Sequence, residues 1–215
     1  MKDFPVFTTE YGVASLTLQQ IPYRGEAYIH VQDSAPGAEK QLVSECARFC
    51  RLAGARRVFV TPAGENPDVR ILEMRGVPGL DPEQIQNIFP VTESTVSRWR
   101  ELANEKLRDV DLAAMLTKKD EEKILLSGGA YFIHRQGKLM GIGWLEGETL
   151  RLLAAAEPGA GFQVAQTLLS VQPGQSIRLE VASTNGRAIH LYEKLGFLPV
   201  AELESWREVR EEDLI

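Results

Sequence analysis

The order of strand and helix patterns in the second half of the chain restricts the fold most strongly. Eight predicted elements follow one another there: helices at 92–110 and 112–126, three strands within 130–157, a helix at 158–170, a strand at 176–183 and a helix at 185–197. Terminal strands complete the chain. Because this order is not a regular alternation of parallel strands and helices, it predicts an α+β (mixed α/β) fold.

Local signals refine the boundaries of these elements. Gln136-Gly137 and the segment 146–148 supply the turns between the three strands. Thr92 or Ser94 is expected to cap the first helix, while the charge run KKDEE is expected to break the second. Asn185 is a good N-cap for the last helix, and Gly196 a good stop.

The first third of the chain repeats part of this order. It reads as a strand at 25–32, a helix at 36–55, a strand at 55–61 and a short helix at 66–77 closed by Gly76. Pro-Gly-Ala occurs at 36–38 and again at 158–160, with a glutamine three residues later in both copies. A proline-glycine turn before a helix is common, so chance is the alternative. We interpret residues 1–80 as a diverged copy, separated by a linker at 81–88 from a domain at 88–215.

The loop AEPGAGFQ, residues 156–163, joins a strand to a helix and suits a phosphate group. The unpaired amides at a helix N-terminus attract anions, and the helix dipole adds to this attraction. Gly159 and Gly161 let the backbone approach a ligand without a Cβ in the way. A tight turn without a ligand explains the same residues.

The segment STNGRAIHLYEKLGF, residues 183–197, carries the most specific signal. Its pattern, Asn, two residues, Ala, three residues and Tyr-Glu-Lys-Leu-Gly-Phe, resembles the last sequence block of the GNAT superfamily of acyl-CoA-dependent N-acyltransferases. The resemblance extends in element order over 88–215. It implies a splayed mixed sheet flanked by helices, here preceded by a smaller GNAT-like half-domain.

The resemblance also implies where acetyl-CoA, the acyl donor, would bind: between a fourth strand at 151–156 and a fifth at 177–183. Tyr192 takes the position of the general acid that protonates the departing CoA thiolate. Ten residues take cofactor-binding positions: Leu153, Ala154, Ala155, Ala156, Gly159, Ala160, Gly161, Phe162, Gln163 and Asn185.

The sequence departs from the family in its phosphate loop. The family pattern is Gln/Arg-x-x-Gly-x-Gly/Ala, whereas this loop begins with Ala156 and has Glu157 and Pro158 where basic residues are usual. A carboxylate beside a phosphate weakens binding. In the N-terminal copy Glu39 stands in place of Gly161, so we expect that copy to bind no CoA.

No general base can be chosen from the sequence. Glu146, Glu148, Glu180 and His134 are candidates, and none has a spacing that selects it. An N-acetyltransferase acting on a primary amine is the leading hypothesis. A GNAT-fold protein that binds CoA or another ligand without catalysis is the second, and an unrelated α/β domain the third.

Composition limits the classes of partner that we expect the protein to bind. A net charge of −6 argues against a nucleic-acid binder, and no apolar stretch is long enough for a membrane span or an export signal. Cys46 and Cys50 are expected to be buried apolar residues, and the three histidines share no metal-ligand motif. We therefore expect a cytoplasmic protein with a small-molecule or peptide amine as acceptor and no metal; homodimer formation stays open.

Overall fold

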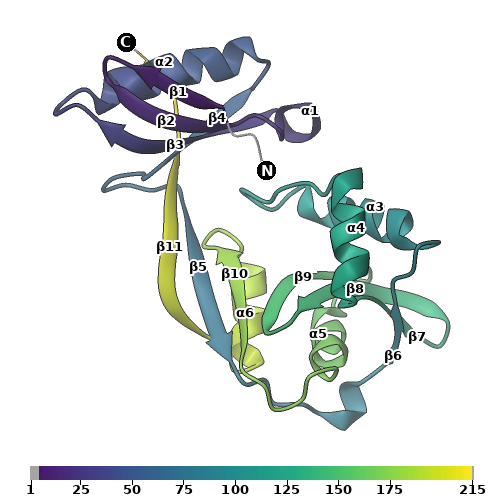
Figure 1. Ribbon diagram of the computed structural model, residues 1–215. Coiled ribbons are helices and arrows are strands. Elements are labelled where there is room, and N and C mark those ends of the chain that lie inside the picture. Colours follow the sequence, from purple (N-terminus) through teal and green to yellow (C-terminus); the bar gives the residue numbers. More distant parts are fainter. Residues whose placement is uncertain (1–4, 215) are drawn as a thin grey trace. The chain divides into compact units, whose positions relative to one another are not determined.

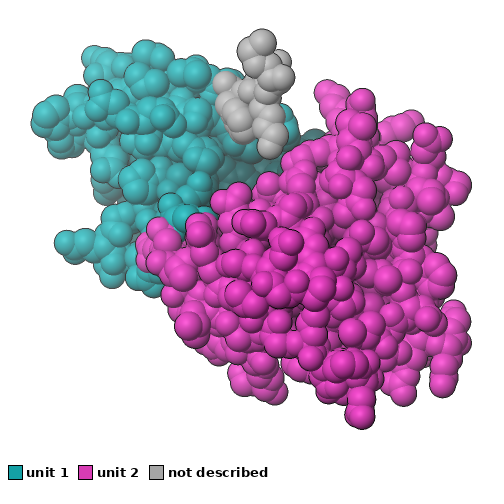
Figure 2. Space-filling view, turned by 60° about the horizontal axis from the view of Figure 1, so that its bottom comes forward, with its two compact units in different colours: residues 1–70, 203–215 teal, residues 71–202 magenta. Residues whose placement is uncertain are grey.

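The computed structural model describes residues 5–214, which form two compact units (Figure 1, Figure 2). Unit 1 combines the chain up to Arg70 with the chain from Leu203 onward, and unit 2 is Ile71–Glu202. The expected linker at 81–88 thus lies inside unit 2. The last residues belong to unit 1 because Arg207 and Glu208 pair with Val60 and Phe59.

Unit 1 is a sheet with one long helix on it, in the strand order β1-β2-β3-β4-β11. Its elements are β1 (Val6–Thr9), β2 (Gly12–Thr17), α1 (Ile21–Arg24), β3 (Glu26–Ser34), α2 (Glu39–Leu52), β4 (Arg57–Thr61), the end of β11 (Leu198–Glu208) and η2 (Glu211–Asp213). The buried face of α2 packs on β2, β3 and β4. Cys46 and Cys50 lie in this core as free thiols, which confirms the expected role.

Unit 2 holds a mixed sheet in the order β5-β10-β9-β8-β7-β6. Its elements are β5 (Val69–Gly76), η1 (Pro82–Gln84), β6 (Asn87–Pro90), α3 (Val96–Leu107), α4 (Lys118–Ser127), β7 (Ala130–Arg135), β8 (Lys138–Glu146), β9 (Thr149–Ala155), α5 (Gly161–Leu169), β10 (Ile177–Ala182) and α6 (Gly186–Lys194).

Helices cover both faces of the unit 2 sheet (Figure 1). On one face, Val164 and Leu168 of α5 and Leu195 beside α6 pack against strand residues such as Leu150 and Leu179. On the other face, Trp99 of α3 and Ile124 of α4 pack against strand residues that include Trp144 and Leu152. The mixed α/β fold class is therefore confirmed.

One predicted helix is wrong. Residues 66–77 were expected to form a short helix, but 69–76 are strand β5. This strand pairs antiparallel with β10 over six residues, from Ile71–Ala182 to Gly76–Ile177. The pairing gives hydrogen-bond partners to backbone groups that a short helix would leave unpaired at its ends. The order of elements in 25–77 therefore matches the order in 149–197 for three elements and differs at the fourth.

Helix boundaries near 92–126 also differ from expectation. The N-cap of α3 is Thr95, and neither Thr92 nor Ser94 takes that place. The charge run of 118–122 does not break a helix but starts one, since α4 begins at Lys118. Asp120 and Thr117 form a capping box there, with the Thr117 amide donating to Asp120 Oδ2 at 2.6 Å.

Gly76 is required for a close approach between chain segments rather than for ending a helix. A Cβ built on it would lie 2.6 Å from the carbonyl oxygen of Gly196 and 2.8 Å from Phe197 Cα. We expect Gly76→Ala to lower the free energy of unfolding by about 1–3 kcal/mol, because backbone atoms cannot move aside as a side-chain end can.

Gly79→Ala is the control for this prediction, since nothing lies within 4 Å of its Cβ position. Its unfolding free energy should stay within about 0.5 kcal/mol of the unmodified chain. Urea denaturation followed by circular dichroism measures both variants, and equal midpoints would contradict the close approach.

Candidate functional site

The parallel strands β9 and β10 separate soon after they begin. They pair at Thr149–Arg178 and Leu150–Leu179, and the pairing ends there. Beyond these two pairs β10 stays paired with β5 along its whole length, and β9 stays paired with β8. The strands therefore splay toward their C-terminal ends, as the resemblance implied.

A β-bulge explains where the separation starts. In the β8–β9 ladder, Leu150 pairs with Leu145 and Leu152 with Trp144, so Arg151 is an extra residue with no opposing residue in the backbone ladder of β8. A bulge bends its strand and increases the local twist. Because the bulge follows directly on the last β9–β10 pair, it turns β9 away from β10.

The splay exposes an unpaired strand edge in the middle of the sheet. The amide of Ala156 donates to the Met140 carbonyl of β8 at 2.8 Å. Since successive amides of a strand point to opposite sides, the amides and carbonyls of Leu153 and Ala155 face the side of β10. These groups can pair with an extended ligand as another strand would.

The loop after β9 ends in a helix N-terminus with free donors. Gly159 has φ +80°, a left-handed conformation that favours glycine. No side chain caps α5, and within the described residues the amides of Gly161, Phe162 and Gln163 donate to no other group. A Cβ built on Gly161 would lie 3.5 Å from Leu191 Cδ2 of α6, an ordinary van der Waals contact.

Glu157, which stands where the family's loop usually has a basic residue, lies next to a positive charge that the sequence pattern did not show. Lys138, the first residue of β8, places its Nζ 3.1 Å from Glu157 Oε1. Both side chains are well exposed, so the pair contributes little to stability. Its relevance is electrostatic: the cation offsets the carboxylate next to amides that would hold an anion.

Tyr192 lies on α6 against the same cluster as the loop. Its side chain is buried and its ring meets Phe197 edge-on, with the ring centroids 6.0 Å apart. The hydroxyl has no hydrogen-bond partner among residues 5–214. Burial raises the pKa of Tyr192 to about 12, so the phenol keeps its proton at neutral pH.

The predicted site residues are brought together in part. Leu153, Ala155, Ala160 and Phe162 join Tyr192 in one apolar cluster. Ala154 faces the opposite side of the sheet, where with Ala156 it lines a small apolar hollow beside Leu102 and Lys106 of α3. Asn185 caps α6, its Oδ1 accepting from the Ala188 amide at 3.2 Å.

The four candidate bases lie on separate elements. Glu146 pairs with Arg151 at 2.8 Å and with Lys123 at 3.7 Å. Glu148 is exposed in the β8–β9 turn, and Glu180 is exposed on β10. His134 stands on β7 with its ring 5.4 Å from that of Phe89, and its buried Nδ1 has no partner within 5–214.

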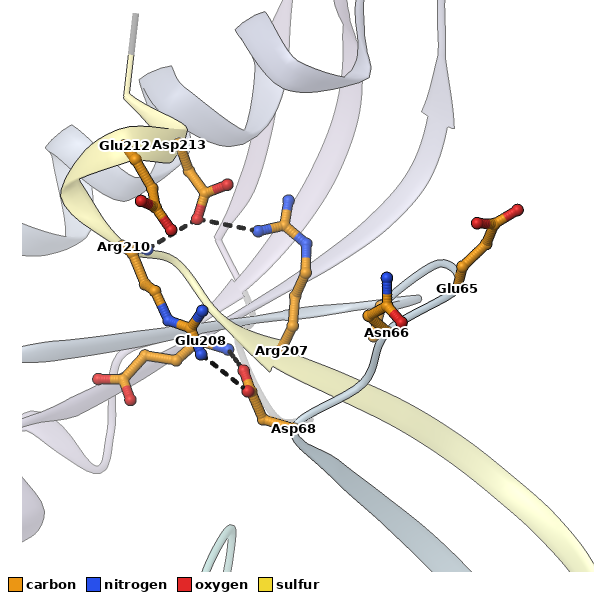
Figure 3. A pocket seen from close by; sticks show the side chains of 9 residues that line it. Glu65, Asn66, Asp68, Arg207, Glu208, Arg210, Glu212 and Asp213 are labelled. Atoms are coloured by element: carbon orange, nitrogen blue, oxygen red, sulfur yellow. Dashed lines mark hydrogen bonds and ion pairs between the residues drawn. The ribbon is translucent and has the colours of Figure 1, made fainter.

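Unit 1 contains a separate polar cavity of about 280 Å³ (Figure 3). Its charged side chains are largely paired with one another: Arg210 with Asp68 at 3.0 Å and Arg207 with Asp213 at 3.1 Å. The cavity shares no residue with the splay, and neither the sequence motifs nor the resemblance points to it.

Metal and membrane features are absent from the part of the chain that the structure describes. Across residues 5–214 no three His, Cys, Asp or Glu side chains are grouped so as to hold a metal ion. No helix in this range has the length and apolar character needed to cross a membrane.

Comparisons with known proteins bear on the fold. No family model and no curated protein matches the sequence. Two solved structures align with a TM-score of 0.57: a conserved protein of unknown function from Staphylococcus epidermidis (10% identity, 98% of this chain and 95% of that chain) and a GCN5-related N-acetyltransferase from Anabaena variabilis (12%, 92% and 59%).

A third solved structure, a GCN5-related N-acetyltransferase from Sphaerobacter thermophilus, aligns with a TM-score of 0.51 at 12% identity, over 92% of this chain and 76% of that chain. These likenesses confirm the GNAT-like fold that residues 183–197 predicted. At such identities they establish the fold alone.

The raised pKa of Tyr192 predicts how stability changes in alkali. An unfolded tyrosine has a pKa of about 10, whereas the folded value is about 12. The stabilisation is therefore complete below pH 10 and is lost as the pH rises toward 12.

We expect the urea midpoint to fall between pH 9 and 11, and to fall less in Tyr192→Phe, which has no phenol to ionise. Absorbance at 295 nm should show one late-titrating tyrosine fewer in the variant. An equal fall in both proteins would show that Tyr192 is not the buried phenol responsible.

Proposed function

We propose that unit 2 binds acetyl-CoA between β9 and β10 and transfers the acetyl group to a primary amine. The observation that carries the proposal is the early end of β9–β10 pairing, which leaves a strand edge free beside an uncapped helix N-terminus. In open α/β sheets, ligands bind beyond the carboxyl ends of strands at such a point.

The donor fits this arrangement group by group. The two amides of its pantetheine arm match the free backbone groups of Leu153 and Ala155, which point away from β8. Its pyrophosphate suits the amides of Gly161, Phe162 and Gln163 at the positive end of α5. Lys138 reduces the repulsion from Glu157.

The chemistry requires one bond to form and one to break. The amine nitrogen bonds to the thioester carbonyl carbon, the carbon–sulfur bond breaks, and the sulfur leaves with a negative charge. Tyr192 is the proposed proton donor to that sulfur, because it takes the position of the family's general acid and lies in one cluster with Leu153 and Ala155 of β9. The phenolate then regains, through water, the proton that the amine nitrogen loses. Holding both reactants in place supplies much of the rate.

Binding without transfer is the second candidate, and a specific observation favours it. Of the candidate carboxylates, Glu146 is engaged by Arg151 and Lys123, and Glu148 and Glu180 are exposed. A protein with this site would hold CoA or a related ligand while catalysing no acyl transfer.

Gly161→Glu tests the location of the donor. The new carboxylate would sit beside the free amides where the pyrophosphate is proposed, and a negative charge there does not harm the helix, since it suits its N-terminus. We expect calorimetry to show micromolar binding of acetyl-CoA to the unmodified chain and at least a tenfold loss in the variant, about 1.4 kcal/mol.

Gln175→Glu is the matched control, because it makes the same change in charge in the exposed segment after α5. It should bind as the unmodified chain does. Equal binding by Gly161→Glu would place the donor elsewhere, and no binding by the unmodified chain at millimolar acetyl-CoA would remove the proposal.

Tyr192→Phe tests the role of the phenol. Removing a general acid lowers rates by a factor on the order of 10² or more, while the aromatic ring that packs on Phe197 is kept. We expect this loss in turnover, measured as thiol released with an amine chosen from a panel, and an acetyl-CoA affinity within about threefold.

Tyr131→Phe, on β7 of the same unit, is the control and should keep full turnover. Unchanged turnover in Tyr192→Phe would mean that water protonates the thiolate. Binding without turnover of any amine, in a panel of small amines and peptide N-termini, would favour the second candidate.

A further inference from the structure

Arg178 and Glu180 of β10 lie on the face of the unit 2 sheet that carries α3 and α4. On the other face, β10 contributes three residues to the cluster under α5 and α6, namely Ile177, Leu179 and Val181. Because side chains alternate along a strand, Arg178 and Glu180 point the opposite way. Both are exposed. Within residues 5–214 the cluster of α3 and α4 takes strand residues from β7, β8 and β9 and none from β10.

These two residues stand where β9 and β10 separate. Arg178 belongs to the first β9–β10 pair, opposite Thr149, and Glu180 is the first residue of β10 beyond the second pair. The Arg178 Nε donates to Thr149 Oγ1 at 2.9 Å, which holds the guanidinium beside β9. The proposed donor runs from the start of α5 back along the free edge of β9, so its thioester end is directed toward this point.

The charges of Arg178 and Glu180 are not neutralised by the neighbouring strand. In the β5–β10 ladder Arg178 faces Arg75, and Glu180 faces Glu73. Like charges directly opposite each other destabilise a sheet. On β5 the two charges pair with each other, Arg75 Nε with Glu73 Oε1 at 2.6 Å. Within residues 5–214, by contrast, Arg178 forms no ion pair, and the Glu180 carboxylate forms neither an ion pair nor a hydrogen bond. One cation and one anion on β10 therefore remain for a ligand.

A free α-amino acid matches the spacing of these two charges. Side chains two residues apart on one face of a strand begin about 7 Å from each other. The ammonium and carboxylate of an α-amino acid are separated by one carbon atom, and a charged hydrogen bond adds about 2.8 Å at each end, so the molecule fits between them. Arginine also suits a carboxylate, which it can bind with two parallel hydrogen bonds.

We infer that the acyl acceptor is a free α-amino acid. Arg178 binds its carboxylate, and Glu180 accepts a hydrogen bond from its ammonium group at the opening between the strands. One proton of the ammonium passes to water, which gives the nitrogen a free electron pair, and transfer then proceeds as proposed above. The amine attacks from the side of α3, whereas Tyr192 lies on the side of α5 and α6. This inference rests on the proposed function, since it names the acceptor of that reaction.

Acceptors that differ only in the carboxylate test the inference. The panel consists of the protein amino acids, each supplied free and as its carboxamide. A carboxamide keeps the amine, has no negative charge and loses its ammonium proton more readily, so intrinsic reactivity favours it. We expect kcat/KM, measured as thiol released from acetyl-CoA, to be at least about tenfold higher for the best free amino acid than for its carboxamide. Equal values, or a preference for the carboxamide throughout, would overturn the inference and leave the proposed function intact.

Two variants distinguish the roles of the charges. Arg178→Gln should lower kcat/KM for the free amino acid at least about tenfold and leave the carboxamide within about threefold, because only the free acid has the group that Arg178 binds. Glu180→Gln should lower both, since both acceptors carry an ammonium. Arg178→Lys keeps the charge without the planar fork and should retain part of the preference. An equal loss for both acceptors in Arg178→Gln would contradict the assignment of the carboxylate to Arg178.

Arg135→Gln is the matched control, because it removes the same charge from an exposed arginine on β7 of the same unit. It should change neither rate. Calorimetry with acetyl-CoA shows whether each variant keeps the donor site, which we expect within about threefold in affinity. If the unmodified chain binds acetyl-CoA but neither binds nor acetylates any amino acid of the panel, the inference is overturned and binding without transfer remains. Absence of acetyl-CoA binding would overturn both.

Discussion

Two residue pairs hold β9 to β10. The proposed site depends on the pairing ending there, because the backbone groups of β9 beyond these pairs are left unpaired. The extra residue Arg151 follows immediately on the second pair. Had β9 continued in register, Leu153 and Ala155 would pair with β10, and no backbone group in the middle of the sheet would be free. Each strand is instead secured on its outer side, β10 by six pairs with β5 and β9 by β8. The opening therefore costs little stability.

The helices that follow these strands complete the site because of the same geometry. Since β9 and β10 are parallel, α5 and α6 both begin at the open end of the splay. Leu191 of α6 lies beside Gly161 at the start of α5, and Tyr192 follows in the shared core. The left-handed Gly159 turns the chain so that the amides after it stay uncapped. One irregular strand thus positions the proposed donor edge, the proposed anion site and the Tyr192 phenol.

Much of the fold could be read from the sequence because its signals are local. The Gln136-Gly137 turn has the positive φ values of 51° and 79° that such a hairpin needs, and Asn185 and Gly196 bound the last helix as their chemistry requires. Strand β5 was misassigned because its state depends on a partner about a hundred residues away. The wrong prediction at the charge run of α4 has a local cause. Thr117 and Asp120 form a capping box that starts a helix there, and the expected helix break did not take it into account.

The site was predictable where a motif carries it and not where tertiary contacts do. The loop glycines could be named from their place before a helix, and Tyr192 from the resemblance of residues 183–197 to the GNAT block. The bulge at Arg151 could not, since register depends on which residues of β8 and β9 face each other. Lys138 reaches Glu157 from another hairpin, and Arg178 reaches Thr149 across 29 residues. Neither pair has a signal in the sequence.

The central claim is that acetyl-CoA binds by pairing with the free backbone groups along the edge of β9. Backbone amide exchange, resolved by residue with and without acetyl-CoA, measures this directly. Bound donor should slow exchange at Leu153, Ala155 and the amides of 161–163, while β1 to β4 of unit 1 stay unchanged. Unaltered exchange along β9 in a protein that binds acetyl-CoA would contradict the account, because the donor would then lie outside the splay.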